Sequence, residues 1–458
     1  MKQYAAFIVD SFSFDPASGR IELRYSLDDE LTFTETILLP SPLPSRGEGP
    51  GVGAALFALH LIGGISYYKT CLPTSIEIRS GKLTEKQAAF WNGVYENGLG
   101  EFFYKNDIDF RGLIRFPSLL DQSPPHPDPL PLPGGEGGKR KILVPIGGGK
   151  DSVVTAELLR KAGHDVTLLR MGHHPLITEL AEKMTMPLLT VERRLDPLLF
   201  KLNTEGALNG HVPITGYLSF LTIIIAELFG FDAVALSNER SANEGNVEFH
   251  GKQINHQWSK SLEFERDFQK YVEENITGNV SYFSLLRPLS ELHIARLFAL
   301  YPQYFSLTTS CNKNWKIIKT PPLPRTGEGA GGWGLWCGQC PKCAFVFALY
   351  SAFLDQKTLI TIFGKNLFDD QALLPLYREL LGLKGIKPFE CVGTPEETKA
   401  ALLLAHRRGD CDDTVIMKMF LTDVLPKIKD PDAMIEDALT PSEEQAIPEE
   451  FQSILRLS

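Results

Sequence analysis

The chain has 458 residues, of which 43% are hydrophobic and 22% charged, and its formal net charge at pH 7 is −10. This length predicts two or three domains, and the composition is that of an ordinary globular protein. The acidic balance argues against nucleic acid as the main partner, because binding a phosphate backbone needs a basic surface.

Apolar and polar positions alternate in the first 40 residues of the chain. Because successive side chains of a strand point to opposite faces, this pattern predicts an antiparallel meander. The residues that follow have a mixed pattern with one helical stretch, LTEKQAAFWNGVYENG (83–98). We therefore predict a β-rich or mixed N-terminal region over 1–120. The first residues contain neither a long apolar core nor a small-residue cleavage site, so we expect a cytoplasmic protein.

Three segments share a pattern of Pro-Leu-Pro, a short spacer and Gly-Glu-Gly: 41–53, 125–138 and 321–334. Their spacing is irregular, so they are not the period of a solenoid. Segments so rich in proline and glycine cannot offset their ordering entropy by burying a core. We interpret them as related insertions in surface loops, with a proline-rich ligand for a partner domain as the alternative. The second insertion, within 121–138, separates the N-terminal region from the rest.

Strand-like and helix-like runs alternate from residue 139 to about 310, beginning with KILVPI and SVVTAELLRKAG. This alternation predicts a parallel sheet covered by helices. The most apolar run, 217–236, is interrupted by two acidic residues and a glycine. We interpret it as a buried helix that leads into a strand rather than as a membrane span. The expected organisation is an α/β domain over 139–350 and a mostly helical C-terminal region over 351–458.

A glycine-rich loop, within PIGGGKDSVV, joins the first of these strands to the first helix. Such a loop directs free backbone N–H groups and the positive end of the helix dipole at one point, which favours an anion. A Walker A loop needs Ser or Thr where Asp151 stands, and a dinucleotide fingerprint needs a glycine where Ser152 stands. The alternative is a turn that serves only close strand–helix packing. The residues of the predicted nucleotide site are Gly147, Gly148, Gly149, Lys150, Asp151 and Ser152.

This loop resembles the signature of the PP-loop ATP pyrophosphatases, Ser-Gly-Gly-x-Asp-Ser, with Gly147 in place of the leading serine. The resemblance implies a doubly wound parallel sheet of the adenine nucleotide alpha hydrolase-like type. It also implies that ATP is cleaved between its α and β phosphates. In that case the loop amides, Lys150 and Ser152 would hold the leaving pyrophosphate, and Asp151 would help to position Mg²⁺. The glycine at 147 removes one hydroxyl donor from the pattern.

Four cysteines come close together in the sequence once the third insertion is set aside: Cys311, Cys337, Cys340 and Cys343. They supply four thiolates for a tetrahedral Zn²⁺, which would be structural because no position remains open for a substrate. A PP-loop followed by Ser-Cys and Cys-x-x-Cys-x-x-Cys is similar to the order in the zinc-bearing deazaguanine nitrile synthases. The alternatives are free buried cysteines and a catalytic pair of thiols, as in cofactor-independent amino-acid racemases. The other three, Cys71, Cys391 and Cys411, are scattered, with no sign that any two flank one carbon atom.

Two polar stretches follow a predicted core strand: SNERSANEGNVEFHG (237–251) and INHQWSKSLEFE (254–265). In doubly wound sheets ligands bind beyond the carboxyl ends of the strands, so we expect these stretches to contact the substrate. General bases are usually His, Glu or Lys. The candidates for proton transfer are therefore Glu239, His256 and Lys260.

Five stretches together resemble the MurL family: FIVDSFSFDPASGRIELRYSLDD, PIGGGKDSVV, SNERSANEGN, HQWSKSLEFE and WCGQCPKCAFVFALYSAF. The resemblance implies an ATP-dependent epimerase of peptidoglycan synthesis that converts the terminal L-glutamate of a UDP-muramoyl dipeptide to D-glutamate through an adenylated carboxylate. The expected partner is this small molecule, without nucleic acid or membrane. Two other functions stay open. One is a PP-loop enzyme for amidation, nitrile formation or thiolation of another substrate, and the other is a non-enzymatic nucleotide-binding module with a zinc knob.

Overall fold

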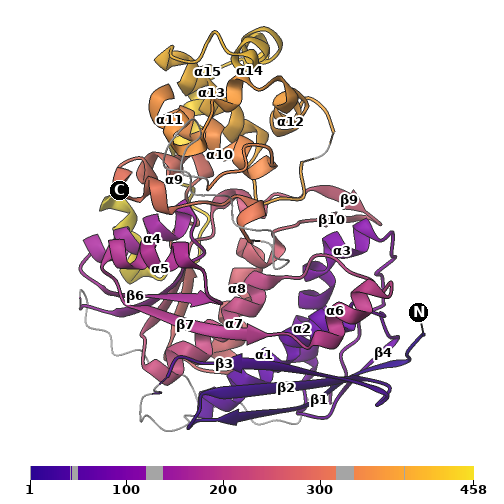
Figure 1. Ribbon diagram of the computed structural model, residues 1–458. Helices are drawn as coiled ribbons and strands as arrows, with labels where there is room; N and C mark the ends of the chain where they lie inside the picture. Colours follow the sequence, from indigo (N-terminus) through magenta and orange to yellow (C-terminus); the bar gives the residue numbers. More distant parts are fainter. Residues whose placement is uncertain are drawn as a thin grey trace.

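The computed structural model in Figure 1 describes residues 2–41, 43, 50–119, 138–315, 335–385 and 387–457. Within these residues one sheet has nine strands in the order β11-β8-β5-β6-β7-β3-β2-β1-β4, and β9 and β10 form a separate hairpin. The strands are β1 (Ala6–Asp15), β2 (Arg20–Leu27), β3 (Leu31–Leu38), β4 (Ser75–Ile78), β5 (Lys141–Pro145), β6 (Asp165–Met171), β7 (Leu188–Arg194), β8 (Ala233–Leu236), β9 (Val247–Phe249), β10 (Lys252–Ile254) and β11 (Ser281–Ser284).

The N-terminal strands β1, β2 and β3 form the predicted antiparallel meander. Strand β3 also pairs antiparallel with β7, with Thr36 opposite Arg194. Next to this junction Arg193 Nε donates to the Glu35 carboxylate at 2.8 Å, and Glu35 is fully buried. The meander and the parallel strands therefore belong to one continuous sheet.

Strands β5, β6, β7, β8 and β11 are parallel, as the strand–helix alternation predicts. Numbered along the chain, these five strands have the order 5-4-1-2-3, so the winding direction reverses between β5 and β8. Alternate residues of β5 enter different cores, with Ile142 in one and Leu143 in the other. Apolar side chains thus cover both faces of the sheet. Ligands of such sheets bind beyond the carboxyl ends of the strands where the order reverses.

Helices are most frequent in the second half of the chain, and every regular element described after β11 is helical. Figure 1 shows α10 to α15 gathered at one end of the molecule, away from β1 to β3. The helices are α1 (Pro50–Tyr68), α2 (Glu85–Gly98), α3 (Gly100–Lys105), α4 (Lys150–Lys161), α5 (Pro175–Met184), α6 (Pro197–Thr204), α7 (Ile214–Phe229), α8 (Leu262–Asn275), α9 (Glu291–Phe298), α10 (Pro341–Ser351), α11 (Gln356–Phe363), α12 (Leu374–Leu380), α13 (Pro395–Arg408), α14 (Val415–Met419), α15 (Pro431–Leu439) and α16 (Glu449–Gln452).

The most apolar run forms the buried helix and strand that its sequence predicts. Helix α7 ends at Gly230, whose φ of +70° closes the helix, and β8 begins three residues later. Among the described helices one stretch, Gly51–Tyr68 in α1, is long and apolar enough to cross a membrane. Within the fold 83% of that stretch is buried, and α1 packs against α7 and β1.

The prediction that 41–53 is a surface loop is wrong for its last four residues. Pro50–Gly53 form the first turn of α1, and Val52 is only 2% exposed. The reason is that the apolar helix extends backwards from residue 54 into the insertion, where Val52 reaches the core. Residues 42 and 44–49 lie outside the described part of the chain, as do the other two insertions except for Gly138.

Candidate functional site

The glycine loop lies where the order of the parallel strands reverses, between the end of β5 and the start of α4. Gly148 has a φ of +78°, which favours glycine. A Cβ atom on Gly147 would meet nothing within 4 Å, and one on Gly149 would meet only Ser310, at 4.0 Å. Gly149 directly precedes α4 and gives the helix no side-chain cap. The loop therefore offers open space next to a helix end whose first N–H groups have no partner within the helix.

Lys150, in the first turn of α4, is buried against acidic side chains. Its Nζ donates to Asp151 Oδ1 at 2.5 Å and to the carboxylate of Glu291, which begins α9. Lys342 Nζ of α10 lies 3.9 Å from Glu291 Oε1. Burial alone would lower the pKa of Lys150, but the carboxylates of Asp151 and Glu291 raise it above the usual range. The Asp151 side chain is 29% exposed and remains accessible from solvent.

The Ser152 side chain faces back into the loop. Its Oγ donates to the carbonyl oxygen of Gly149 at 3.2 Å, and the residue is 6% exposed. The carbonyl of Gly148 accepts a hydrogen bond from Thr309 N at 2.8 Å. These contacts occupy the carbonyl oxygens of Gly148 and Gly149.

Glu239 and Lys260 come from the two polar stretches and are held by one arginine. Arg287 donates to the backbone oxygens of Glu239, at 2.8 Å, and of Lys260, at 2.5 Å. The same guanidinium pairs with Glu265 at 2.7 Å, and both side chains are almost completely buried. Burial and the nearby carboxylate of Glu291 raise the pKa of Glu239 above that of an ordinary carboxyl group. Arg287 therefore positions two of the three predicted proton-transfer residues.

Replacing Arg287 by glutamine is expected to lower the free energy of unfolding by about 3–5 kcal/mol, because the Glu265 carboxylate loses its buried partner. Urea denaturation followed by circular dichroism measures the change. Arg266→Gln, on the exposed side of α8, is the matched control and should change stability by less than about 0.5 kcal/mol. The double variant with Glu265→Gln should recover part of the loss. If Arg287→Gln unfolds like the control, the ion pair does not organise this site.

His256 lies beside a second group of polar side chains, which are partly or fully buried. Its Nδ1 bonds the carboxylate of Glu101 in α3, and the Cys391 thiol lies near enough to raise the pKa of the ring. Lys260 Nζ lies 3.4 Å from the same sulfur atom. The His211 ring centroid is 4.5 Å from that of His256. The structure thus brings His256 and Lys260 to one cysteine that the sequence did not single out.

Other polar residues of the two stretches make structural contacts. Arg240 donates to the backbone oxygens of Asp437 and Thr440. Asn243 Oδ1 accepts from N of Leu262, the first residue of α8, at 2.8 Å. These contacts connect the loop to α15 and α8. A structural role therefore accounts for both side chains.

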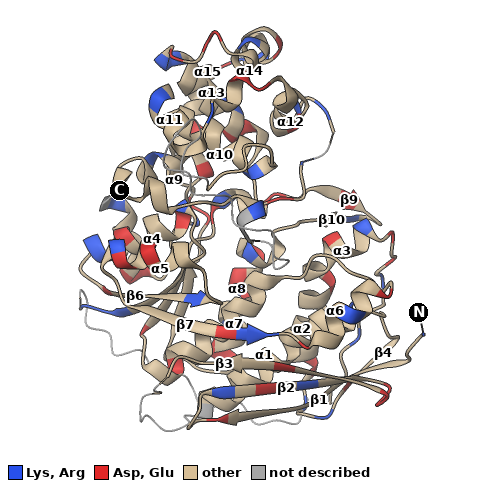
Figure 2. Cartoon of the chain, in the orientation of Figure 1, with Lys and Arg blue, Asp and Glu red and all other residues tan. Residues whose placement is uncertain are grey.

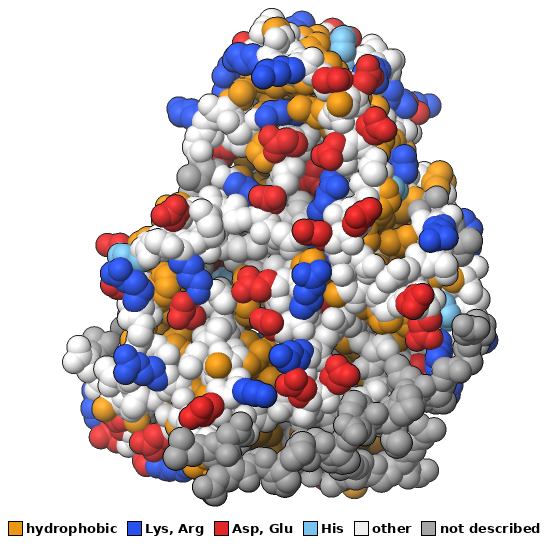
Figure 3. Space-filling model, turned by 180° about the vertical axis from the view of Figure 1, so that it is seen from behind, with side chains coloured by type: hydrophobic (Ala, Val, Ile, Leu, Met, Phe, Trp, Pro, Cys, Tyr) orange, Lys and Arg blue, Asp and Glu red, His pale blue; other side chains and the backbone are white. Residues whose placement is uncertain are grey.

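The buried charges contrast with the molecular surface. On the face shown in Figure 3 acidic and basic side chains are interspersed, and exposed pairs of this kind contribute little to stability. Figure 2 shows acidic and basic segments close together between the sheet and the upper helices. Lys150, Glu239 and Glu291 are each less than 7% exposed. A buried group of charges at the end of a parallel sheet is typical of a functional site.

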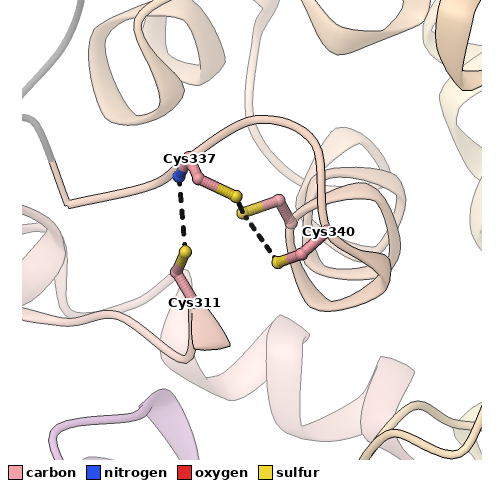
Figure 4. A group of neighbouring side chains, drawn as sticks. Cys311, Cys337 and Cys340 are labelled. Carbon is pink, nitrogen blue, oxygen red and sulfur yellow. Dashed lines mark hydrogen bonds between the residues drawn. The ribbon is translucent and has the colours of Figure 1, made fainter. Parts of the chain in front are cut away.

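The four predicted metal ligands come together (Figure 4), with their ligand atoms within 4.8 Å of one another. The Cys343 sulfur is 3.4 Å from that of Cys340 and 3.7 Å from that of Cys337, and Cys311 Sγ accepts from Cys337 N at 3.4 Å. Gly338 has a φ of +64°, which turns the chain between two ligands. In a tetrahedron with metal–sulfur bonds of about 2.3 Å the sulfur atoms are about 3.8 Å apart. The cluster can therefore hold a metal ion.

Three residues of this region carried no signal in the sequence: Glu101, Glu291 and Cys391. Each contacts a predicted residue that is more than 100 positions away along the chain. No local pattern could have connected them, since only the folded sheet and the C-terminal helices bring the segments together.

Two family models match the chain: the MurL N-terminal domain over residues 1–285 and the MurL C-terminal domain over residues 307–435. Glu239, His256 and Lys260 lie in the first match and Cys391 in the second. The site is therefore built from both matched regions.

The chain is similar to curated proteins named UDP-N-acetyl-alpha-D-muramoyl-L-alanyl-L-glutamate epimerase. The one from Xanthomonas oryzae pv. oryzae is 38% identical over 97% of this chain and 96% of its own length. The one from Micromonospora sp. is 37% identical over 99% of this chain and 98% of its own length. A 7-cyano-7-deazaguanine synthase from Sulfolobus acidocaldarius is 26% identical over 45% of each chain.

Proposed function

The chain belongs to the MurL family, and on that premise we propose that it is the epimerase that inverts the terminal L-glutamate of UDP-N-acetyl-α-D-muramoyl-L-alanyl-L-glutamate. The reaction consumes ATP, releases AMP and pyrophosphate, and serves peptidoglycan synthesis. The observation that carries the proposal is the likeness to the named epimerases over nearly the whole of both chains. The enzyme is an isomerase that needs both matched regions for its site.

Adenylation explains why such an isomerase would need ATP. Removing the α-proton next to a free carboxylate would place two negative charges on neighbouring atoms. Transfer of AMP to the carboxylate cancels its charge and makes the α-proton far more acidic. After inversion water cleaves the mixed anhydride and releases AMP. In this scheme the substrate itself supplies the acidifying group, and pyridoxal phosphate is not required.

We assign the pyrophosphate half of ATP to the glycine loop, in a doubly wound sheet of the PP-loop type. The open space beside Gly147 and the uncapped start of α4 support this assignment. Lys150 and Ser152 would hold the phosphate oxygens. The accessible Asp151 carboxylate would hold Mg²⁺, whose oxygen-ligand preference it fits. Bound Mg²⁺ supplies charge neutralisation for the leaving pyrophosphate.

Glu239, His256 and Lys260 are the candidates that we propose for the proton-transfer site at the α-carbon. Two observations support this proposal. His256 and Lys260 both lie close to Cys391, and Arg287 bonds the backbone oxygens of Glu239 and Lys260. The four-cysteine cluster would hold a structural Zn²⁺, since four thiolates leave no position for substrate. All seven cysteines lie in the described residues and none forms a disulfide, which fits the proposed cytoplasmic location.

The test is to incubate the protein with ATP, Mg²⁺ and UDP-N-acetylmuramoyl-L-alanyl-L-glutamate. AMP is measured by chromatography, and the configuration of glutamate by chiral analysis after acid hydrolysis. We expect D-glutamate to appear together with AMP and pyrophosphate. AMP without inversion would instead indicate an adenylating enzyme of another kind, and nucleotide binding without pyrophosphate release would indicate a binding module.

A further inference from the structure

Cys391 lies in the short segment between α12 and α13, and two proposed catalytic side chains converge on its sulfur atom. Lys260 Nζ is 3.4 Å from Sγ, and the His256 ring lies near enough to lower the pKa of the same thiol. The Glu101 carboxylate bonds Nδ1 of that imidazole. Cysteine, histidine and glutamate thus form a connected row in which the third group orients the second, an arrangement that activates thiols.

Several contacts fix the position of this cysteine. Asn246 Nδ2 donates to the backbone oxygen of Pro388 at 2.9 Å, and Asn246 Oδ1 accepts from His256 N at 2.8 Å. The Phe389 ring stacks on Tyr104 of α3 with centroids 5.2 Å apart. One asparagine therefore bonds both the segment that carries Cys391 and the segment that carries His256. These two bonds fix the position of the Cys391 segment relative to the His256 segment.

Positively charged side chains lie close to Cys391. Burial would raise the pKa of the thiol, but the Lys260 ammonium and the His256 hydrogen bond lower it to about 6. Cys391 and Glu101 in turn raise the pKa of His256 to about 9, against the effect of burial. Lys342 and Lys387 add positive charge from α10 and from the same segment. At pH 7 these pKa values favour a thiolate beside an imidazolium ion, and the Cys391 residue is half-buried.

We propose that Cys391 is a catalytic acid–base residue that takes the α-proton from the adenylated glutamyl group, an inference that rests on the proposed epimerase function. The α-carbon–hydrogen bond breaks, its proton moves to Sγ, and the electron pair moves onto the acyl oxygen as an enolate. A proton from Glu239 re-forms the bond on the opposite face. Glu239 then regains a proton from solvent, and Cys391 loses one to solvent. Lys260 stabilises the thiolate and is a positioning residue in this step.

The decisive variant is Cys391→Ala, assayed for two half-reactions. Substrate-dependent exchange of labelled pyrophosphate into ATP reports adenylation, and deuterium incorporation at the glutamate α-carbon in D₂O reports proton removal. We expect exchange within about threefold of the parent and a loss of deuterium incorporation and inversion of about 10²- to 10⁴-fold. Cys391→Ser should behave in the same way, because its hydroxyl group stays protonated. Cys71→Ala, which removes another half-buried thiol, should leave both half-reactions unchanged.

The outcomes separate the two proposals. If the parent protein shows neither pyrophosphate exchange nor AMP formation with the muramoyl dipeptide, the proposed function fails. If the parent inverts glutamate and Cys391→Ala does so within fivefold, or loses both half-reactions equally, the inference about Cys391 is overturned while the function stands.

Thiol labelling gives a readout that does not depend on turnover. Iodoacetamide at pH 7, followed by peptide mass spectrometry, should modify Cys391 about tenfold faster than Cys71, whose pKa is raised by burial. Equal or slower labelling of Cys391 would contradict a thiolate at this position.

Discussion

Replacement of Asp151 by alanine is expected to abolish AMP formation while the protein stays folded. Asp151 lies in the first turn of α4, next to the open side of the glycine loop, and its carboxylate is partly exposed. A lost ligand to the metal ion at the leaving pyrophosphate removes several kcal/mol of transition-state stabilisation. This corresponds to a loss of roughly 10²- to 10³-fold or more in turnover.

The stability cost of this change should be small. Lys150 keeps its bond to Glu291 when Asp151 is removed, so no buried charge is left without a partner. The partly exposed pair contributes about 1 kcal/mol or less. Thermal unfolding and AMP chromatography measure the two effects on the same preparation. Asp165→Ala, which removes an exposed carboxylate at the start of β6, is the matched control. Full turnover in Asp151→Ala would show that the loop does not hold the metal-bound phosphate.

The glycine loop could be predicted because all of its determinants are contiguous. A strand, three glycines and a helix follow one another, and the geometry at Gly148 is a local backbone property. The cluster of four cysteines could also be predicted from the sequence, because the turn at Gly338 and the start of α10 fix the spacing of three of them. Patterns of this kind depend on neighbouring residues in the chain, so they can be recognised without knowledge of the fold.

The remainder of the site depends on long-range packing. Cys391 meets Lys260 across 131 positions of the chain, and Glu101 meets His256 across 155. The sequence around Cys391 contains no glycine loop, repeated spacing or amphipathic run to indicate a role. Its significance comes only from the charges that α3, α10 and the segment before α8 place around it. Likewise the start of α1 inside the first insertion follows from burial of Val52, which composition alone did not predict.

Cys343→Ser is expected to remove the metal ion and to destabilise the C-terminal helices. Cys343 is fully buried in α10, which packs against α9, α11, α12 and α13. Zinc binding to four thiolates contributes directly to folding free energy, so the loss should amount to several kcal/mol. Elemental analysis should find about one zinc per chain in the parent and far less in the variant. The melting temperature should fall by several degrees.

Cys411→Ser is the matched control, because Cys411 is a buried thiol outside the cluster. It should keep the full metal content, whatever it costs in packing. A chelator should lower the melting temperature of the parent and of Cys411→Ser but not that of Cys343→Ser. Because Cys391 lies between α12 and α13, loss of the metal should also slow the labelling of Cys391 by disturbing its contacts with Lys260 and His256. Retention of one zinc per chain in Cys343→Ser would mean that the cluster is not the metal site, and its four cysteines would then be free thiols.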